Sequence, residues 1–164
     1  MRGDAPSAEG IDPVSLLPGM PEQGLHAALY RLWLNKRAAV SAEGRGELPG
    51  RGAFDPLEMP ELLPNLTLFD VERAPLRFRI RLVGTAIVAA MGKDTTGFYL
   101  DQLDRIEAVE RRARELVETK RPYFLSDQPL SWTHRDYKTY SVLGLPLAAD
   151  GKTVDMLLYS MLFT

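Results

Sequence analysis

Few side chains in this sequence have the types and spacing that chemistry requires. The 164 residues include no cysteine, which excludes disulfides, thiolate nucleophiles, cysteine-ligated metals and flavin photochemistry through a cysteinyl adduct. Haem would need an axial ligand, and the two histidines are His26 and His134. His134 is more simply read as a surface residue of a strand. No cluster of histidines and carboxylates has ligand spacing, so the sequence predicts no metal site, and no motif identifies a cofactor.

Carboxylate pairs offer little more chemistry. Asp101 and Asp104 lie three residues apart near a predicted helix start, where capping explains them. Asp70 and Glu72 share one face of a predicted strand, without a histidine. An enzyme of the ketosteroid-isomerase type would need a buried aspartate together with a tyrosine, and the available aspartate is Asp155. We therefore predict no catalytic residue and a protein that is not an enzyme, with such an isomerase as the less favoured alternative.

The most regular pattern in the chain is the stretch 76–84, Leu-Arg-Phe-Arg-Ile-Arg-Leu-Val-Gly. Strict alternation of apolar and charged residues is typical of a strand with one buried face. The apolar face carries Phe78, Ile80 and Leu82, and the cationic face carries Arg77, Arg79 and Arg81. Three interpretations of the cationic face stay open. It could be solvated, pair with Asp70 or Glu72 across a hairpin, or seat the N-terminal helix or an acidic partner.

Composition predicts one globular domain. Hydrophobic residues make up 45% and charged residues 26% of the chain, as in ordinary water-soluble domains. A net charge of −2 argues against nucleic acid or an anionic membrane surface as partners. No apolar run approaches the roughly 18 residues that span a bilayer, and the first residues do not read as a signal peptide. We therefore predict a cytoplasmic protein.

The part of the chain before the predicted domain divides into three. Residues 1–20 carry few large apolar groups, which predicts a disordered leader. Residues 21–39 form a predicted helix whose apolar stripe includes Leu29 and Trp33. This helix either packs on the domain's own sheet or serves as a homodimerisation or partner-docking helix. The glycine-rich residues 40–54 lack the strand, helix and Lys-Ser/Thr pair of a phosphate loop, so they are predicted to be a flexible linker.

Residues 55–164 read as a single α+β domain. A short helix begins at Asp55, strands 66–72 and 76–84 form a hairpin, and a helix capped by Thr85 ends at Gly92. A capping box of Asp104 and Glu107 opens a longer helix. Three strands then cover 123–136 (broken at a proline), 140–147 and 154–163, the last two joined by an Asp-Gly turn. Hairpin connections predict one five-stranded antiparallel sheet with a helical block on one face.

This order of elements resembles the PAS fold. The segments 30–37, 63–66, 78–85, 91–97 and 145–155 resemble a family of small stand-alone bacterial PAS proteins, and the likeness covers roughly residues 22–163. The resemblance implies a five-stranded antiparallel sheet, a helical block on one face and an extra N-terminal helix. It also implies a sensor or interaction module that holds a small molecule between the sheet and the helical block, and that often dimerises through an N-terminal helix.

The expected pocket combines strand alternation with this fold. Phe78, Ile80 and Leu82 would form its floor. Residues from the helical block and the later strands would cover it or orient a ligand, namely Ile87, Met91, Tyr99, Trp132, Tyr140 and Tyr159. The alternative is that these side chains simply fill a core. The predicted partner-binding residues are Leu29, Trp33, Arg77, Arg79 and Arg81.

The sequence thus predicts a non-catalytic PAS-like sensory or regulatory module in signal transduction. It would form a homodimer, bind an unidentified small molecule and contact a signalling protein. The alternative is a homodimeric interaction scaffold with a filled core and no ligand. Neither the ligand nor the partner is identified by any motif.

Overall fold

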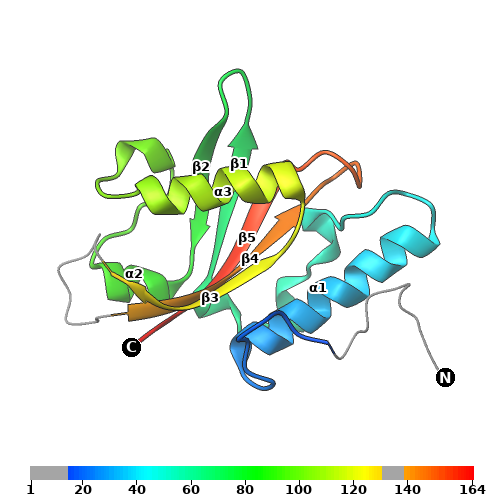
Figure 1. The fold of residues 1–164 in the computed structure, drawn as a ribbon, viewed down its shortest axis with the longest axis horizontal. Helices are drawn as coiled ribbons and strands as arrows, with labels where there is room; N and C mark the ends of the chain where they lie inside the picture. Colours follow the sequence, from blue (N-terminus) through cyan, green and yellow to red (C-terminus); the bar gives the residue numbers. More distant parts are fainter. Residues whose placement is uncertain (1–14, 131–138) are drawn as a thin grey trace.

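Five strands form one antiparallel sheet in the order β2-β1-β5-β4-β3 in the computed structural model, which describes residues 15–130 and 139–164 (Figure 1). The strands are β1 (Leu66–Glu72), β2 (Arg77–Val83), β3 (Tyr123–Pro129), β4 (Thr139–Leu147) and β5 (Met156–Phe163). The helices are α1 (Leu25–Ala42), α2 (Thr85–Met91) and α3 (Glu107–Thr119). The predicted α+β class, the five-stranded antiparallel sheet and the additional N-terminal helix are confirmed.

The two faces of the sheet are covered by different helices. Tyr159 of β5 faces the side of α2 and α3, where both helices contribute to a common cavity. Its neighbour Ser160 points the other way and bonds to His26 of α1 through its Oγ, 2.7 Å from Nδ1. Figure 1 shows α3 crossing one side of the sheet, with α1 set apart from α2 and α3. The sheet is therefore the middle layer between α1 and the α2–α3 block.

Predicted helix ends were partly right. The Asp55 carboxylate accepts a hydrogen bond from Leu57 N (2.9 Å) at a short 3-10 turn, and Gly92 ends α2 with φ +79°. Thr85 is not the cap of α2, because Gly84 occupies that position. A Cβ on Gly84 would overlap the Pro64 carbonyl, so the close approach of the two segments requires glycine.

The predicted capping box of Asp104 and Glu107 is wrong. The chain adopts a left-handed turn at Arg105, whose φ is +58°, between Asp104 and the helix start. The N-cap of α3 is Ile106, which provides no side-chain hydrogen bond. The apolar residue is instead buried in the core, and that burial anchors the start of the helix.

The predicted linker, residues 40–54, is not a flexible linker but part of the packed domain. Leu48 and Phe54 are buried, and the amides of Glu47 and Leu48 both donate to the carbonyl of Gly151 in the β4–β5 turn. The glycines that suggested flexibility instead permit contact, because a Cβ on Gly46 would overlap the Gly151 backbone. This segment continues through the 3-10 turns η2 (Arg51–Ala53), η3 (Pro56–Glu58) and η4 (Leu63–Asn65) into β1.

The described part of the predicted disordered leader also differs from expectation. Residues 15–20 pack on the core, with Met20 buried and Leu16 and Leu17 against it. Residues 1–14 lie outside the described residues. At the other end of the domain, β3 ends at Pro129, which cannot donate to the ladder. The remainder of the predicted strand, to residue 136, lies largely outside the described residues.

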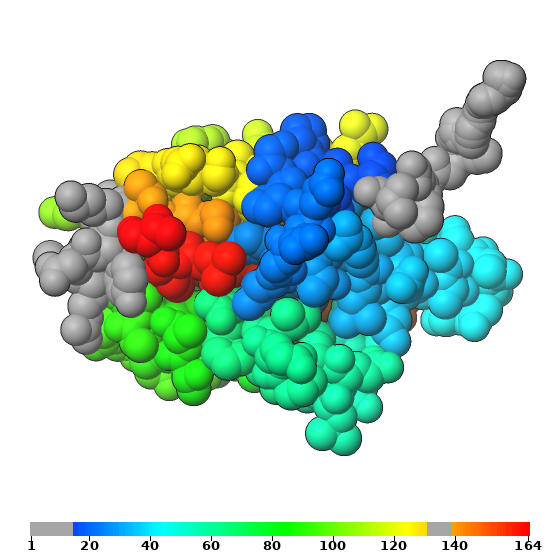
Figure 2. Space-filling model, turned by 90° about the horizontal axis from the view of Figure 1, so that it is seen from below, coloured from blue at the N-terminus to red at the C-terminus, as the bar shows by residue number. Residues whose placement is uncertain are grey.

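The helix α1 packs on its own sheet. Leu29 and Trp33 are each 0% exposed, and the Trp33 indole nitrogen donates to the Pro146 carbonyl of β4 at 3.1 Å. Figure 2 shows α1 (blue) beside the following segment (teal) on this face, and Lys36 bonds to Glu58 across the contact at 3.3 Å. Leu29 and Trp33 therefore belong to the domain's core and are not available to a partner, which corrects their expected role.

A buried histidine fastens the start of α1 to the sheet. His26 is 3% exposed, with Nδ1 2.7 Å from Ser160 Oγ, Nε2 2.9 Å from Ser141 Oγ and its ring edge-on to Phe124. Burial lowers the pKa of His26 from 6.5 to about 4 because desolvation disfavours the imidazolium.

This histidine predicts acid sensitivity. Between pH 6.5 and about 4 the unfolded chain takes up a proton at His26 that the folded protein excludes, so stability falls as the pH drops through that window. The loss attributable to His26 is about 3 kcal/mol when the window is complete. Urea unfolding at a series of pH values checks this by the difference between wild type and His26→Gln. That difference shrinks toward pH 4, and a difference independent of pH would contradict the account.

The described part of the chain contains no helix that is both long enough and apolar enough to cross a membrane.

Candidate functional site

The site lies on the α2–α3 face of the sheet, around one row of cross-strand partners. Register places Tyr123, Gly144, Tyr159, Thr67 and Val83 side by side on β3, β4, β5, β1 and β2. Gly144 leaves room for its neighbours, since a Cβ there would lie 2.9 Å from the Tyr159 ring and 3.0 Å from the Tyr123 ring. The two tyrosine rings consequently lean together over the glycine, with centroids 6.3 Å apart.

Above this row a partly open cavity of about 70 Å³ lies between the sheet and the helices. From the sheet it is lined by Thr67, Phe69, Ile80, Val83, Tyr123, Tyr140, Val142, Tyr159 and Met161. The helical side contributes Ile87, Met91, Thr95, Leu100, Leu103, Ile106, Val109 and Arg112. Most of these groups are apolar, and the cavity is far smaller than the roughly 300 Å³ or more of pockets for drug-sized ligands. Any occupant must therefore be small.

Five of the predicted pocket residues line this cavity: Ile80, Ile87, Met91, Tyr140 and Tyr159. Of the other four, Phe78 is buried on the same face of β2 as Ile80 but lies outside the lining. Trp132 lies outside the described residues. Leu82 and Tyr99 do not line the cavity either, and the pairing of the strands accounts for the position of each.

Leu82 is directed away from the cavity by a β-bulge. Leu68 of β1 is paired with Leu82, but the next residue, Phe69, is paired with Ile80, which leaves Arg81 as an extra residue on β2. An inserted residue resets the two-residue alternation of a strand. Leu82 is therefore 41% exposed on the opposite face, and Val83 lines the cavity in its place.

Tyr99 lies at the edge of the sheet and not in the cavity. It forms an isolated bridge with Arg79 just before the 3-10 turn η5 (Leu100–Gln102), and its hydroxyl donates to Glu72 at 2.9 Å. The Arg77 guanidinium lies 3.7 Å from the centroid of the Tyr99 ring and donates two hydrogen bonds to Asp101, at 2.8 and 2.9 Å. These bonds hold the pKa of the Asp101 carboxyl below its usual range. The packing, not a ligand, accounts for Tyr99.

The cationic face of β2 is engaged mainly within the domain. Arg77 is bound to Asp101, and Arg81 lies 3.3 Å from Asp70 across the hairpin, as one interpretation predicted. Arg79 is exposed. The expectation that this face seats the N-terminal helix is wrong, because α1 packs on β4 and β5. The twist and order of the sheet put β2 at the edge remote from α1.

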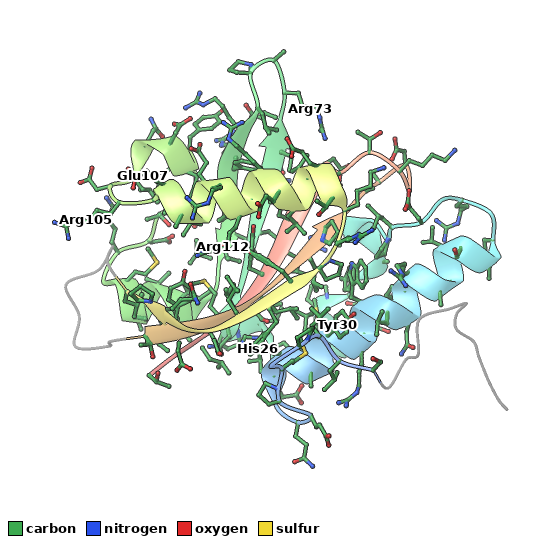
Figure 3. All side chains as sticks on the ribbon, viewed as in Figure 1. His26, Tyr30, Arg73, Arg105, Glu107 and Arg112 are labelled. Atoms are coloured by element: carbon green, nitrogen blue, oxygen red, sulfur yellow. The ribbon has the colours of Figure 1, made fainter. Side chains whose placement is uncertain are left out.

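Arg112 is the residue of the site that sequence reasoning missed. It is half-buried on α3, lines the cavity and donates through Nη2 to the Tyr140 hydroxyl at 3.3 Å. Figure 3 shows it on the sheet side of α3. The signal was present in the spacing, because Val109, Arg112 and Leu116 follow one another at the i, i+3, i+7 positions of an amphipathic helix.

The tyrosine hydroxyls around Arg112 are strongly desolvated. Burial raises the pKa of Tyr123 to about 12 and that of Tyr159 well above 10, so both carry their protons at neutral pH. Tyr159 is 3% exposed, and its buried hydroxyl has no hydrogen-bond partner among the described residues. An unsatisfied buried hydroxyl is costly, which marks this end of the cavity as a place where a hydrogen-bonding group is missing.

No histidine or carboxylate of the described residues lines the cavity. His26 lies on the opposite face of the sheet, bonded to two serines (Figure 3), and so cannot serve as an axial haem ligand in the cavity. His134 lies outside the described residues. Asp155 is in the β4–β5 connection, where its carboxylate accepts from Ala149 N at 3.1 Å. Within residues 15–130 and 139–164 no three histidines and carboxylates converge as metal ligands.

A second hollow lies on the opposite face of the sheet. This groove of about 380 Å³ is bordered by Leu66 and Leu68 of β1, Leu82 of β2 and the apolar side chains of segment 54–64. It is larger than the cavity, and Leu82 is an exposed apolar residue on its wall. Below, this surface is called the outer groove.

Comparison with known proteins identifies related domains. The profile described as PAS domain matches residues 23–162. Among solved structures, the PAS domain of histidine kinase ThkA is 16% identical, with a TM-score of 0.45, and the alignment covers 59% of this chain and 97% of that one. A sensory box sensor histidine kinase from Vibrio cholerae is 14% identical, with a TM-score of 0.46 and coverage of 77% and 97%. No curated protein sequence matches.

Proposed function

The chain belongs to the PAS domain family, and from that premise we propose that it is a non-catalytic sensory or regulatory module in signal transduction whose cavity binds a small molecule. The observation that carries the proposal is the cavity between the sheet and α2–α3, with the unsatisfied Tyr159 hydroxyl inside it. A filled core would leave neither the space nor the missing hydrogen bond.

Strand β5 connects the cavity to the other face of the sheet. Tyr159 lines the cavity, and the adjacent Ser160 bonds to His26 of α1. On β4, Tyr140 lines the cavity and the adjacent Ser141 bonds to the same histidine. A ligand that shifts these two strands would therefore change the position of α1 on the sheet. Ligand binding would then shift the population between two positions of α1, and a signalling partner would bind one of them preferentially.

Thermal unfolding in the presence of a library of small molecules tests the proposal. A compound that binds only the folded protein stabilises it by RT ln(1 + L/Kd), where L is its free concentration, so the melting temperature rises with the logarithm of that concentration once it exceeds Kd. The matched control is Val142→Phe, which fills the cavity from β4 and abolishes the shift. If no compound stabilises the wild-type protein, and native mass spectrometry also finds it free of ligand, the sensor proposal fails.

The outer groove favours a second candidate function, a homodimeric interaction scaffold. The groove has about five times the volume of the cavity and an exposed leucine on its wall. Exposed apolar surface of this kind marks interaction sites, and a second copy of the chain is the occupant that this candidate requires. Contacts would then involve Leu82 rather than Leu29 and Trp33.

Leu82→Glu separates the two functions. If the groove holds a second copy, the variant is monomeric by light scattering at concentrations where the wild type is a dimer, because a carboxylate is disfavoured in an apolar contact. The partial exposure of Leu82 keeps the loss of folding stability within about 1 kcal/mol. Phe98→Glu is the control, since Phe98 is 38% exposed but lies outside the groove. If Leu82→Glu and Phe98→Glu form dimers to the same extent, the scaffold candidate is contradicted.

A further inference from the structure

We propose that the cavity binds a short-chain carboxylate, with the carboxyl group held by Arg112 and the tyrosine hydroxyls and the alkyl chain directed into the apolar end. This inference rests on the proposed function, because it names the chemical class of the ligand for the same cavity. Two observations on opposite sides of the cavity carry it: a cation on α3 and an unsatisfied donor on β5.

Arg112 supplies the positive charge. The guanidinium is half-buried, lines the cavity, and donates one hydrogen bond to a neutral group, the Tyr140 hydroxyl. No carboxylate of the described residues is within ion-pair distance of Arg112, and no carboxylate lines the cavity. A guanidinium presents several N–H donors in one plane, which match the two oxygens of a carboxylate. Among the described residues, the cavity therefore has a cation without a counter-charge.

The tyrosines supply further donors of the right protonation state. Tyr159 and Tyr123 keep their protons because burial raises the pKa of both hydroxyls. The Tyr159 hydroxyl lies near that of Tyr123 but makes no hydrogen bond of good geometry with any described residue. An anion accepts hydrogen bonds only, so it satisfies such donors without presenting one of its own. A neutral amide of the same size carries no negative charge, so it does not compensate the charge of the Arg112 guanidinium.

The rest of the cavity selects for size and an apolar chain. Beyond the polar end the walls are alkyl groups, among them Ile80, Ile87, Met91 and Leu103. The volume of about 70 Å³ is about half of the 150 Å³ cavity that accommodates benzene. Propionate and butyrate fit these limits better than aromatic acids, dicarboxylates or inorganic phosphate.

The experiment is a calorimetric titration of the full chain with propionate, and with its neutral isostere propionamide, at constant pH and ionic strength. We expect propionate to bind and propionamide to bind at least tenfold more weakly, because a charge-assisted hydrogen-bonded pair is lost. Arg112→Gln weakens propionate at least tenfold, and Arg112→Lys weakens it less. Arg111→Gln is the matched control, since Arg111 is exposed on the same helix and its loss leaves the affinity unchanged.

Tyr159→Phe provides a readout that a purely structural role would not give. Removal of the unsatisfied hydroxyl raises the melting temperature of the ligand-free protein, yet it weakens propionate binding several-fold. A variant that lowers both quantities would contradict the assigned role of Tyr159.

The remaining outcomes separate this inference from the proposed function. Equal binding of propionate and propionamide, or binding insensitive to Arg112→Gln, overturns the carboxylate while a ligand-binding cavity stands. Stabilisation by phosphate or chloride to the same extent as by propionate indicates an adventitious ion only and overturns it too. If library compounds bind but neither propionate nor butyrate does, the carboxylate inference is overturned while the ligand-binding cavity stands. If no ligand of any kind binds, both proposals fail.

Discussion

Trp33→Ala is expected to lower the free energy of unfolding by about 3–5 kcal/mol, the usual cost of truncating a buried tryptophan. The side chain is 0% exposed, stacks on Tyr30 with ring centroids 6.2 Å apart, and donates to the Pro146 carbonyl. The substitution leaves a cavity between α1 and the sheet and an unsatisfied carbonyl on β4. Urea unfolding followed by circular dichroism measures the loss.

The control is Asn35→Ala, two residues along the same helix and exposed, which changes stability by less than about 0.5 kcal/mol. If α1 were instead a dimerisation helix, Trp33→Ala would change the oligomeric state and its effect on stability would depend on protein concentration. Loss of stability that is independent of concentration supports packing within one chain. Trp33→Phe keeps most of the volume and serves where the alanine variant does not fold.

Phe78→Ala is the second large effect, again about 3–5 kcal/mol. Phe78 is 1% exposed and belongs to the core cluster beneath the helical block. Because it does not line the cavity, the substitution lowers stability without removing a ligand contact. Thermal unfolding gives the stability, and the ligand-dependent increment in melting temperature is expected to persist.

The neighbouring residue is the matched control for Phe78. Arg79 is exposed on the opposite face of β2, so Arg79→Ala is expected to change stability by less than about 0.5 kcal/mol. Similar losses for the two substitutions would contradict the assignment of one buried and one solvated face to this strand.

The alternation of residues 76–84 shows how far sequence reasoning reaches. Phe78 and Ile80 are buried and Arg79 and Arg81 are exposed, as the period of two predicts. The pattern fails at Leu82, because the bulge at Arg81 arises from the pairing with β1. A bulge depends on the partner strand, so the residues of β2 alone do not reveal it.

The start of the chain shows the opposite limitation. Glycines such as Gly46 are typical of flexible linkers, and the same residue type permits the close backbone contact with Gly151. Only the tertiary arrangement distinguishes the two uses. The apolar stripe of α1 likewise predicts a buried face but not what buries it, and the structure places its own sheet there.

The polar end of the cavity was the least predictable part of the site. Tyr140 and Tyr159 were expected from their strand positions, and both line the cavity. Arg112 is absent from the residues that the sequence predicts for the site. An arginine can extend its charged group some distance from its backbone position, so its end point depends on the packing of α3 over β4.

The central claim is that a small molecule binds between the sheet and the α2–α3 block. Methyl NMR of selectively labelled protein tests it most directly, with a compound found by the thermal screen. Saturation is predicted to shift the methyl signals of Ile80, Ile87 and Met91, which line the cavity, and to leave Leu57, which is 87% exposed, unchanged. Shifts confined to Leu82 and the outer groove, with the cavity methyl groups unmoved, would contradict the account.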